Sequence, residues 1–222
     1  MKVMAIAVHP DDETLGCGGT LLKHMMAGDS LHWVIATEMN PNDYSSAARA
    51  RQQQQVDDVY KSYPFSTLDW LRLPTTRIET LSLNGIIGEL ESSIDRIRPD
   101  IVYAPFYGDS HSDHRVIFDA LMGILRPTYM LPRGVRKVLS CEVMSETEAA
   151  TPGVRPAFVP NLFVDISATI ERKLELFSLY QTEVHPEPGP RSLSAIRAQA
   201  RFRGATIGVP YAESFVTLRE IA

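Results

Sequence analysis

The chain has only two cysteines among its 222 residues, Cys17 and Cys141. Two thiols are too few for a disulfide framework or for a zinc site built from thiolates, and they favour a reducing compartment. No apolar run approaches the roughly 20 residues needed to span a bilayer. The short apolar run in the first ten residues is followed directly by acidic residues, and no small-residue cleavage site is present. No signal peptide is therefore expected. These absences predict a cytoplasmic protein without stable membrane insertion.

Positive charge is also scarce. The chain carries 22 Lys and Arg against 27 Asp and Glu, for a net charge of −5. This balance gives no reason to expect nucleic acid or an anionic membrane as the main partner. The hydrophobic content of 44% and charged content of 22% are typical of a globular protein. We therefore expect a single domain covering 1–222, which is long enough to bury a substantial core.

Short apolar runs alternate along the chain with longer helical patterns. Strands are expected at 2–8, 31–39, 68–73, 101–106, 137–145 and 161–167, and helices at 14–29, 45–63, 82–98, 112–125 and 168–184. This alternation predicts an α/β fold of the Rossmann-like, three-layer α/β/α type, with a mainly parallel sheet. The proline-containing stretches 146–160 and 185–192 are predicted to be loops, and long loops are often functional.

A cluster of acids follows the first predicted strand, in the sequence "AVHPDDE" that ends at Glu13. Carboxylates this close together repel one another unless a positive charge lies among them. A simpler interpretation is that Asp11 or Asp12 caps the following helix. The helix dipole favours acids there by only about 0.3–1 kcal/mol, which explains one acid better than it explains the whole cluster.

A second cluster follows the fourth predicted strand and contains Asp109, His111, Asp113 and His114. Because the carboxyl ends of parallel strands meet at one edge of a sheet, we expect both clusters to lie together there. A divalent cation would relieve the repulsion between the acids. Imidazole and carboxylate ligands without cysteine suit Zn²⁺, and Fe²⁺, Mn²⁺ or Co²⁺ are also compatible.

The spacing within the two clusters indicates a reaction. Neighbouring aspartates in a turn point in different directions, so one can bind the metal while the other faces the metal's water. Zinc lowers the pKa of such a water from 15.7 to about 7, and a nearby carboxylate can take its proton. His111 could stabilise an oxyanion or protonate a leaving group, while Asp113 orients a nearby imidazole. Together these parts predict metal-assisted hydrolysis of an acyl bond.

The motifs "AVHPDDE" and "HSDH", with "GVPYAESFVTL" near the end, resemble those of the LmbE/PIG-L family of metal-dependent N-deacetylases. Members of this family remove acetyl groups from amino sugars and related N-acyl amines. The resemblance implies a zinc-dependent deacetylase that acts on an N-acetylated small molecule such as an amino sugar or its conjugate. It assigns His9, Asp12 and His114 as metal ligands, Asp11 as general base, His111 as stabiliser of the tetrahedral intermediate, and Asp113 as the acid supporting His111. We also expect a homo-oligomer.

The residues expected to contact the substrate depart from the family pattern. Relatives often have a substrate-binding arginine at the start of the second helix, and either Arg49 or Arg51 could correspond to it. A glutamate often follows that arginine by three residues, and this sequence has glutamine there. Thr75 or Thr76 replaces an aspartate that holds a sugar hydroxyl in relatives. Asp109 occupies a position where some relatives carry a tyrosine, and it is a further candidate for contacting the substrate. The sequence therefore predicts intact catalytic machinery with altered substrate contacts.

Three alternatives stay open at this point. The metal site could hydrolyse another small amide or ester, or the chain could be a catalytically inactive relative that binds a small molecule. The third alternative, a nucleotide-binding module, is supported by the α/β pattern alone. The glycines from Gly16 to Gly19 lack the lysine of a phosphate-binding loop, and close packing of helix on sheet explains them better.

Overall fold

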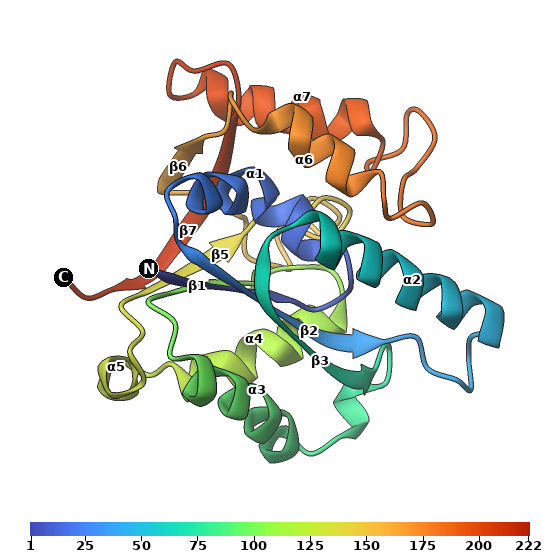
Figure 1. Cartoon of the computed structure of the whole chain (residues 1–222), viewed down its shortest axis with the longest axis vertical. Helices are drawn as coiled ribbons and strands as arrows, with labels where there is room; N and C mark the ends of the chain where they lie inside the picture. The colour runs from blue at the N-terminus through green and yellow to red at the C-terminus, as the bar shows by residue number, and fades with distance from the viewer.

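The computed structural model describes all of residues 1–222 and is organised around one seven-stranded sheet (Figure 1). The strands lie in the order β3-β2-β1-β4-β5-β7-β6. Their bounds are β1 Lys2–Ala7, β2 Ser30–Glu38, β3 Phe65–Pro74, β4 Ile101–Ala104, β5 Lys137–Cys141, β6 Leu162–Asp165 and β7 Ala212–Glu220. The first five strands in this order, from β3 at the edge to β5, pair in parallel. Strand β7 runs antiparallel to both of its neighbours, β5 and β6. The predicted mainly parallel α/β sheet is confirmed.

Helices cover both faces of the sheet, which gives the three predicted layers (Figure 1). One face carries α1 Asp12–Met26, α2 Ser46–Ser62, α6 Ile170–Phe177 and α7 Leu193–Ala205, and the other carries α3 Leu83–Ile97, α4 Ser112–Ile124 and the short α5 Pro127–Met130. Two separate hydrophobic cores result, one on each side of the sheet. No helix is both long enough and apolar enough to cross a membrane.

Strand β1 shows why the first apolar run is uninterrupted. Val3 and Ala5 pack into the core beneath α1, while Met4 and Ile6 pack into the core beneath α3 and α4. Side chains along a strand alternate between faces, and here both faces are covered by helices. A run of consecutive hydrophobic residues is therefore the stable choice for this central strand.

The glycines near the start of α1 allow the helix to lie close to its neighbours. A Cβ atom on Gly16 would lie 2.8 Å from the Cβ of Cys141, and one on Gly19 would lie 2.9 Å from Ile166. Both distances are too short for carbon atoms in contact. The glycines therefore serve close packing, as predicted, and Cys17 is a buried residue in the same packed layer.

The order of the strands creates a crevice at one edge of the sheet. Strand β1 pairs with β2 on one side and with β4 on the other. The helices that follow β1 and β4, α1 and α4, lie on opposite faces of the sheet. Such a switch point leaves space beyond the carboxyl ends of the two strands, where ligands of open α/β sheets bind.

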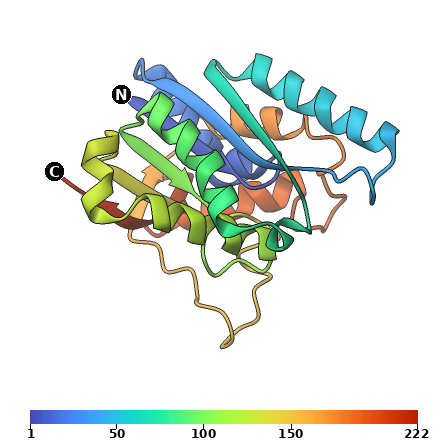
Figure 2. The same cartoon turned by 90° about the horizontal axis from the view of Figure 1, so that it is seen from below.

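The structure differs from the predicted elements near the C-terminal end. The helix predicted over 168–184 ends at Phe177, and the chain then turns so that Tyr180 is buried with its hydroxyl on Glu13. The strand predicted over 137–145 ends at Cys141. Strand β7 was not predicted, because charged and polar residues interrupt its apolar ones. The stretches 146–160 and 185–192 are loops, as predicted, and the first projects from the body of the protein in Figure 2.

Candidate metal centre and active site

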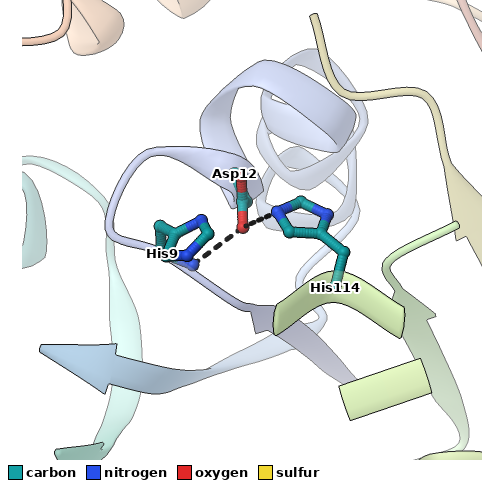
Figure 3. Close-up of side chains that lie close together, drawn as sticks. All are labelled: His9, Asp12 and His114. Atoms are coloured by element: carbon teal, nitrogen blue, oxygen red, sulfur yellow. Dashed lines mark hydrogen bonds and ion pairs between the residues drawn. The ribbon is translucent and has the colours of Figure 1, made fainter. Parts of the chain in front are cut away.

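Three side chains from the two sequence clusters converge at the switch point (Figure 3). His9 follows β1, Asp12 is the first residue of α1, and His114 lies in the first turn of α4. One potential ligand atom from each residue lies within 4.8 Å of the other two. The His114 Nε2 atom is 3.4 Å from Asp12 Oδ2. The structure thus brings together the three residues that the sequence proposes as metal ligands.

The backbone of the turn holds Asp12 in place. Its Oδ2 atom accepts hydrogen bonds from the amides of Val8 and His9, both at 2.8 Å. The carboxylate therefore folds back toward the end of β1 and does not extend into solvent. Pro10 also restricts the residue before it to extended conformations, which suits the turn between β1 and α1.

Asp109 fixes the ring of His114 from behind. The His114 Nδ1 atom lies 2.8 Å from Asp109 Oδ2, and neither side chain is exposed. The other carboxylate oxygen of Asp109 accepts a hydrogen bond of 2.7 Å from the Thr147 hydroxyl. The expectation that Asp109 contacts the substrate is therefore wrong for this structure, because its carboxylate is buried and fully engaged. Its position is that of a group orienting a ligand imidazole.

The residues present fit a divalent cation. The Nε2 atom of His114 is buried and has no hydrogen-bond partner within the protein. Burial opposes protonation of this ring, but the carboxylates of Asp12 and Asp109 outweigh it and raise the pKa of His114 to about 9. The cluster therefore favours a positive charge where the ligand atoms converge. Two imidazoles and a carboxylate are ligands of catalytic zinc sites and also suit Fe²⁺, Mn²⁺ and Co²⁺.

Asp113 contacts His9 more closely than it contacts His111. Its Oδ2 atom lies 3.2 Å from His9 Nε2 but 3.8 Å from His111 Nδ1. The same oxygen accepts hydrogen bonds from the Thr75 hydroxyl at 3.1 Å and the Thr76 amide at 2.9 Å. The predicted direct support of the His111 ring is thus corrected, because the Asp113 carboxylate orients the imidazole of His9.

His111 caps the N-terminus of α4 and faces the cavity. Its Nδ1 atom accepts a hydrogen bond of 3.1 Å from the Asp113 amide. Burial lowers the pKa of His111, and the neighbouring His9 lowers it further. A neutral ring whose Nδ1 is an acceptor carries its proton on Nε2. His111 can therefore donate a hydrogen bond from Nε2.

Asp11 occupies the N-cap position of α1 but its side chain does not cap the helix. The simpler interpretation of this acid as a helix cap therefore fails for Asp11. Its φ of 129° lies in a region that residues with a side chain rarely adopt. Burial raises the pKa of Asp11 well above its usual range, and Asp12 raises it further, while Arg191 lowers it. The Asp11 Oδ2 atom lies 2.9 Å from Arg191 Nη1.

These groups border a cavity of about 190 Å³. Its lining includes His9, Asp11, Asp12, Met39, Tyr44, Gln52, Thr75, Thr76, His111, Met144, Glu146, Glu183 and Arg191. Neither Arg49 nor Arg51, the two arginines proposed to contact the substrate, lines it. Arg49 borders a neighbouring hollow, which shares Met39 and Gln52 with the cavity. Arg51 is exposed on α2. The prediction that Arg49 or Arg51 contacts the substrate therefore applies only to a part of the substrate that extends beyond this cavity.

The cavity residues that the sequence analysis missed include Gln52, Glu146, Glu183 and Arg191. Gln52 accepts a hydrogen bond of 3.0 Å from the Met39 amide. Glu146 accepts one of 3.2 Å from the His111 amide, so it helps to hold that residue. Glu146 and Arg191 lie in the two predicted loops. The length of these loops was the one feature of the sequence that could have indicated a role in the site. No spacing rule connects such loop residues to the motifs at the strand ends.

A family model described as PIG-L, GlcNAc-PI de-N-acetylase, matches residues 4–125, which contain both clusters. The chain belongs to the PIG-L family. A diacetylchitobiose deacetylase from Thermococcus kodakarensis is 26% identical to this PIG-L chain, over 96% of the chain and 81% of the relative. The resemblance to the LmbE/PIG-L family is thereby confirmed.

Solved structures share the fold over almost the whole chain. The N,N'-diacetylchitobiose deacetylase from Pyrococcus horikoshii has a TM-score of 0.75 and 21% identity, covering 98% of this chain and 84% of that one. The 4-carboxy-2-hydroxymuconate hydratase GalB from Pseudomonas putida KT2440 has a TM-score of 0.73 and 13% identity, covering 100% and 97%. A deacetylase and a hydratase thus share this fold, so the reaction has to be argued from the residues of the site.

Proposed function

We propose that this PIG-L protein is a metal-dependent N-deacetylase that acts on a small N-acetylated molecule, such as an amino sugar or its conjugate. The observation that supports this proposal is the position of Asp11 beside the convergent group of His9, Asp12 and His114, in one cavity. A binding protein has no need of a buried second carboxylate beside the three ligand residues. Deacetylases among the relatives also favour this reaction.

His9, Asp12 and His114 would hold the cation, and Asp113 and Asp109 orient the two imidazoles from behind. When bound, a cation such as Zn²⁺ supplies a Lewis acid that polarises a carbonyl group and makes water more acidic. The second layer of carboxylates also increases the basicity of the imidazole ligands, which strengthens metal binding. Both carboxylates are buried, so solvent does not weaken these contacts.

Asp11 transfers the proton in the proposed reaction, and His111 stabilises the developing negative charge. Asp11 accepts the proton of the water that attacks the amide carbonyl, which is the role of a general base. His111 donates from Nε2 toward the oxygen on which negative charge develops. The proton that Asp11 has taken up then passes to the nitrogen, the C–N bond breaks, and the amine and acetate are the two products. His111 keeps its Nε2 proton and lines the same cavity as Asp11.

The cavity has the size and lining for a small polar group. At about 190 Å³ it is smaller than the roughly 300–1,000 Å³ typical of pockets for drug-sized ligands. The acyl group and the adjoining part of a sugar fit such a space better than a whole oligosaccharide does. Gln52, Thr75, Thr76 and Glu146 provide hydrogen-bonding groups around it, which suits a hydroxylated substrate.

An acetate-release assay tests this function. The protein would be prepared free of metal, reconstituted with Zn²⁺, Fe²⁺, Mn²⁺ or Co²⁺, and tested on N-acetylglucosamine, its oligomers and glycosides, together with acetyl esters and other small amides. We expect acetate release from at least one N-acetyl amino sugar, and its loss in Asp11→Asn with the metal content unchanged. Turnover of esters or other amides alone would contradict deacetylation and favour another hydrolase. No turnover of any substrate, with ligand affinity retained in Asp11→Asn, would indicate a binding protein.

A further inference from the structure

We propose that Arg191 is a positioning residue that holds the carboxylate of Asp11 for catalysis. This inference rests on the proposed function, in which Asp11 is the general base. Arg191 lies 180 residues further along the chain, in the loop that precedes α7. Neither the motifs nor the predicted role of any residue in them assigns a part to this arginine.

The contacts of Arg191 are specific to the site. Its Nη1 atom lies 2.9 Å from Asp11 Oδ2 and 2.9 Å from Glu183 Oε2. The side chain is 21% exposed, whereas that of Asp11 is 3% exposed. All three residues line the cavity. The guanidinium group therefore bridges the proposed base and an acid from the segment that leads into its own loop.

The segment 180–191, which carries Arg191, contacts the acids after β1 at a second point. The hydroxyl of Tyr180 donates a hydrogen bond of 2.8 Å to Glu13 Oε1, and both residues are buried. The ends of the intervening loop are also joined, since the amide of His185 donates to the carbonyl of Arg191 at 3.2 Å. The chain from Tyr180 to Arg191 thus contacts two acids of the motif, Glu13 and Asp11, one from each of its ends.

Asp11 needs an external partner because its own backbone does not position its side chain. Its φ of 129° is strained, and its carboxylate makes no capping bond to α1. Strained residues persist where the surrounding structure holds them. The Asp11 carboxylate accepts its one hydrogen bond within the protein at Oδ2, from Arg191. Oδ1 is therefore the oxygen available to accept the proton of the attacking water.

The arrangement is poorly suited to a purely structural role. The Nε atom of Arg191 is buried without a hydrogen-bond partner, so the guanidinium is only partly satisfied. Buried ion pairs are often no more stabilising than apolar side chains of similar volume. A stabilising contact alone could be made by an apolar residue, whereas orientation of a carboxylate requires a donor of fixed geometry. Arginine supplies such a donor.

Kinetics on Arg191→Met and Arg191→Lys test this inference. Both variants would be assayed with the N-acetyl substrate found for the wild type, in parallel with Arg197→Met. Arg197 is a suitable control because it also pairs with a glutamate, Glu171, but lies on an exposed face of α7. We expect kcat to fall at least tenfold in Arg191→Met with KM within threefold, partial recovery in Arg191→Lys, and no change in Arg197→Met. Metal content should be unchanged in all three.

A second readout does not depend on turnover. Urea unfolding of metal-free wild type, Arg191→Met, Asp11→Asn and the double variant forms a double-mutant cycle. We expect the effects of the two substitutions on the unfolding equilibrium constant to deviate from independence by at least fivefold. Independent effects would overturn the contact itself.

The kinetic outcomes separate this inference from the proposed function. An active wild type with unchanged kcat in Arg191→Met would overturn the positioning role and leave deacetylation intact. An unchanged kcat with a raised KM would instead make Arg191 a substrate-binding residue, which also contradicts the inference. A wild type without activity on any acyl substrate would refute the proposed function, and with it the catalytic role of Arg191.

Discussion

The Nδ1 atom of His114 lies 2.8 Å from a carboxylate oxygen of Asp109, and both side chains are completely buried. This contact determines how the ring is turned, since it leaves Nε2 directed toward Asp12, 3.4 Å away. Thr147 holds the other oxygen of Asp109 at 2.7 Å. His114 is thus oriented by Asp109, in the loop that precedes α4, and indirectly by Thr147, in the loop that follows β5.

Asp109→Asn should weaken metal binding without unfolding the protein. The substitution keeps the size of the side chain but removes the charge behind His114, and loss of such outer partners typically costs about 10–100-fold in metal affinity. Titration of metal-free protein with Zn²⁺ against a competing chelator would measure this change. Asp119→Asn serves as the control, because Asp119 is exposed on α4, the helix that carries His114. This variant should bind zinc like the wild type. Equal affinities for all three proteins would contradict the orienting role.

His114→Ala should abolish metal binding. The substitution removes the one proposed ligand atom that is completely buried and without a partner in the protein. Elemental analysis after reconstitution and dialysis should find about one transition metal ion per wild-type chain and almost none in the variant. A wild-type protein that retains no metal after reconstitution would refute the metal-dependent mechanism. Circular dichroism of the variant would show whether it is folded.

Gly19→Ala should destabilise the protein, whereas Gly88→Ala should not. A Cβ atom at position 19 would meet Ile166 at 2.9 Å, while one at position 88 has nothing within 4 Å. Overpacking of a buried contact costs typically about 1–3 kcal/mol. Replacing an exposed helical glycine by alanine stabilises by roughly 0.5–1 kcal/mol. Urea unfolding of both variants would measure the difference, and a Gly19→Ala protein as stable as the wild type would show that α1 can move away.

His32 should make stability depend on pH at a position distant from the cavity. Burial lowers the pKa of His32 below its ordinary value of 6.5, and Lys2 and Arg96 lower it further. The unfolded chain therefore takes up this proton more readily than the folded protein does. The stability that results is fully present above the unfolded pKa and is lost as pH falls through the folded pKa.

Urea unfolding at pH 7.5 and at pH 5.5 would test the effect of His32. We expect the wild type to lose more stability on acidification than His32→Gln does, by a fraction of the roughly 1.4 kcal/mol that corresponds to one pKa unit. The ring lies 2.9 Å from the Thr67 hydroxyl, which can bond the neutral imidazole. An identical pH dependence in both proteins would show that His32 titrates as freely in the folded state as in the unfolded one.

Much of the fold could be read from the sequence because its signals are local. The continuous apolar run of β1 and the helical pattern of α3 each reflect burial on known faces. Strand β7 lacked such a signal, since it is stabilised by pairing with β5 and β6, far from it in the chain. The end of α6 likewise depends on the burial of Tyr180 against Glu13.

By itself, the sequence determined the α/β alternation and the two polar clusters at strand ends. Chain connectivity alone requires that His9 follow β1 and that His114 lie in the first turn of α4. Only the tertiary structure decided which carboxylate serves which imidazole, Asp113 with His9 and Asp109 with His114. It also decided that Arg191 meets Asp11. Such contacts join residues that the chain separates widely or turns in unpredictable directions, so their geometry exists only once the packed core has positioned the loops.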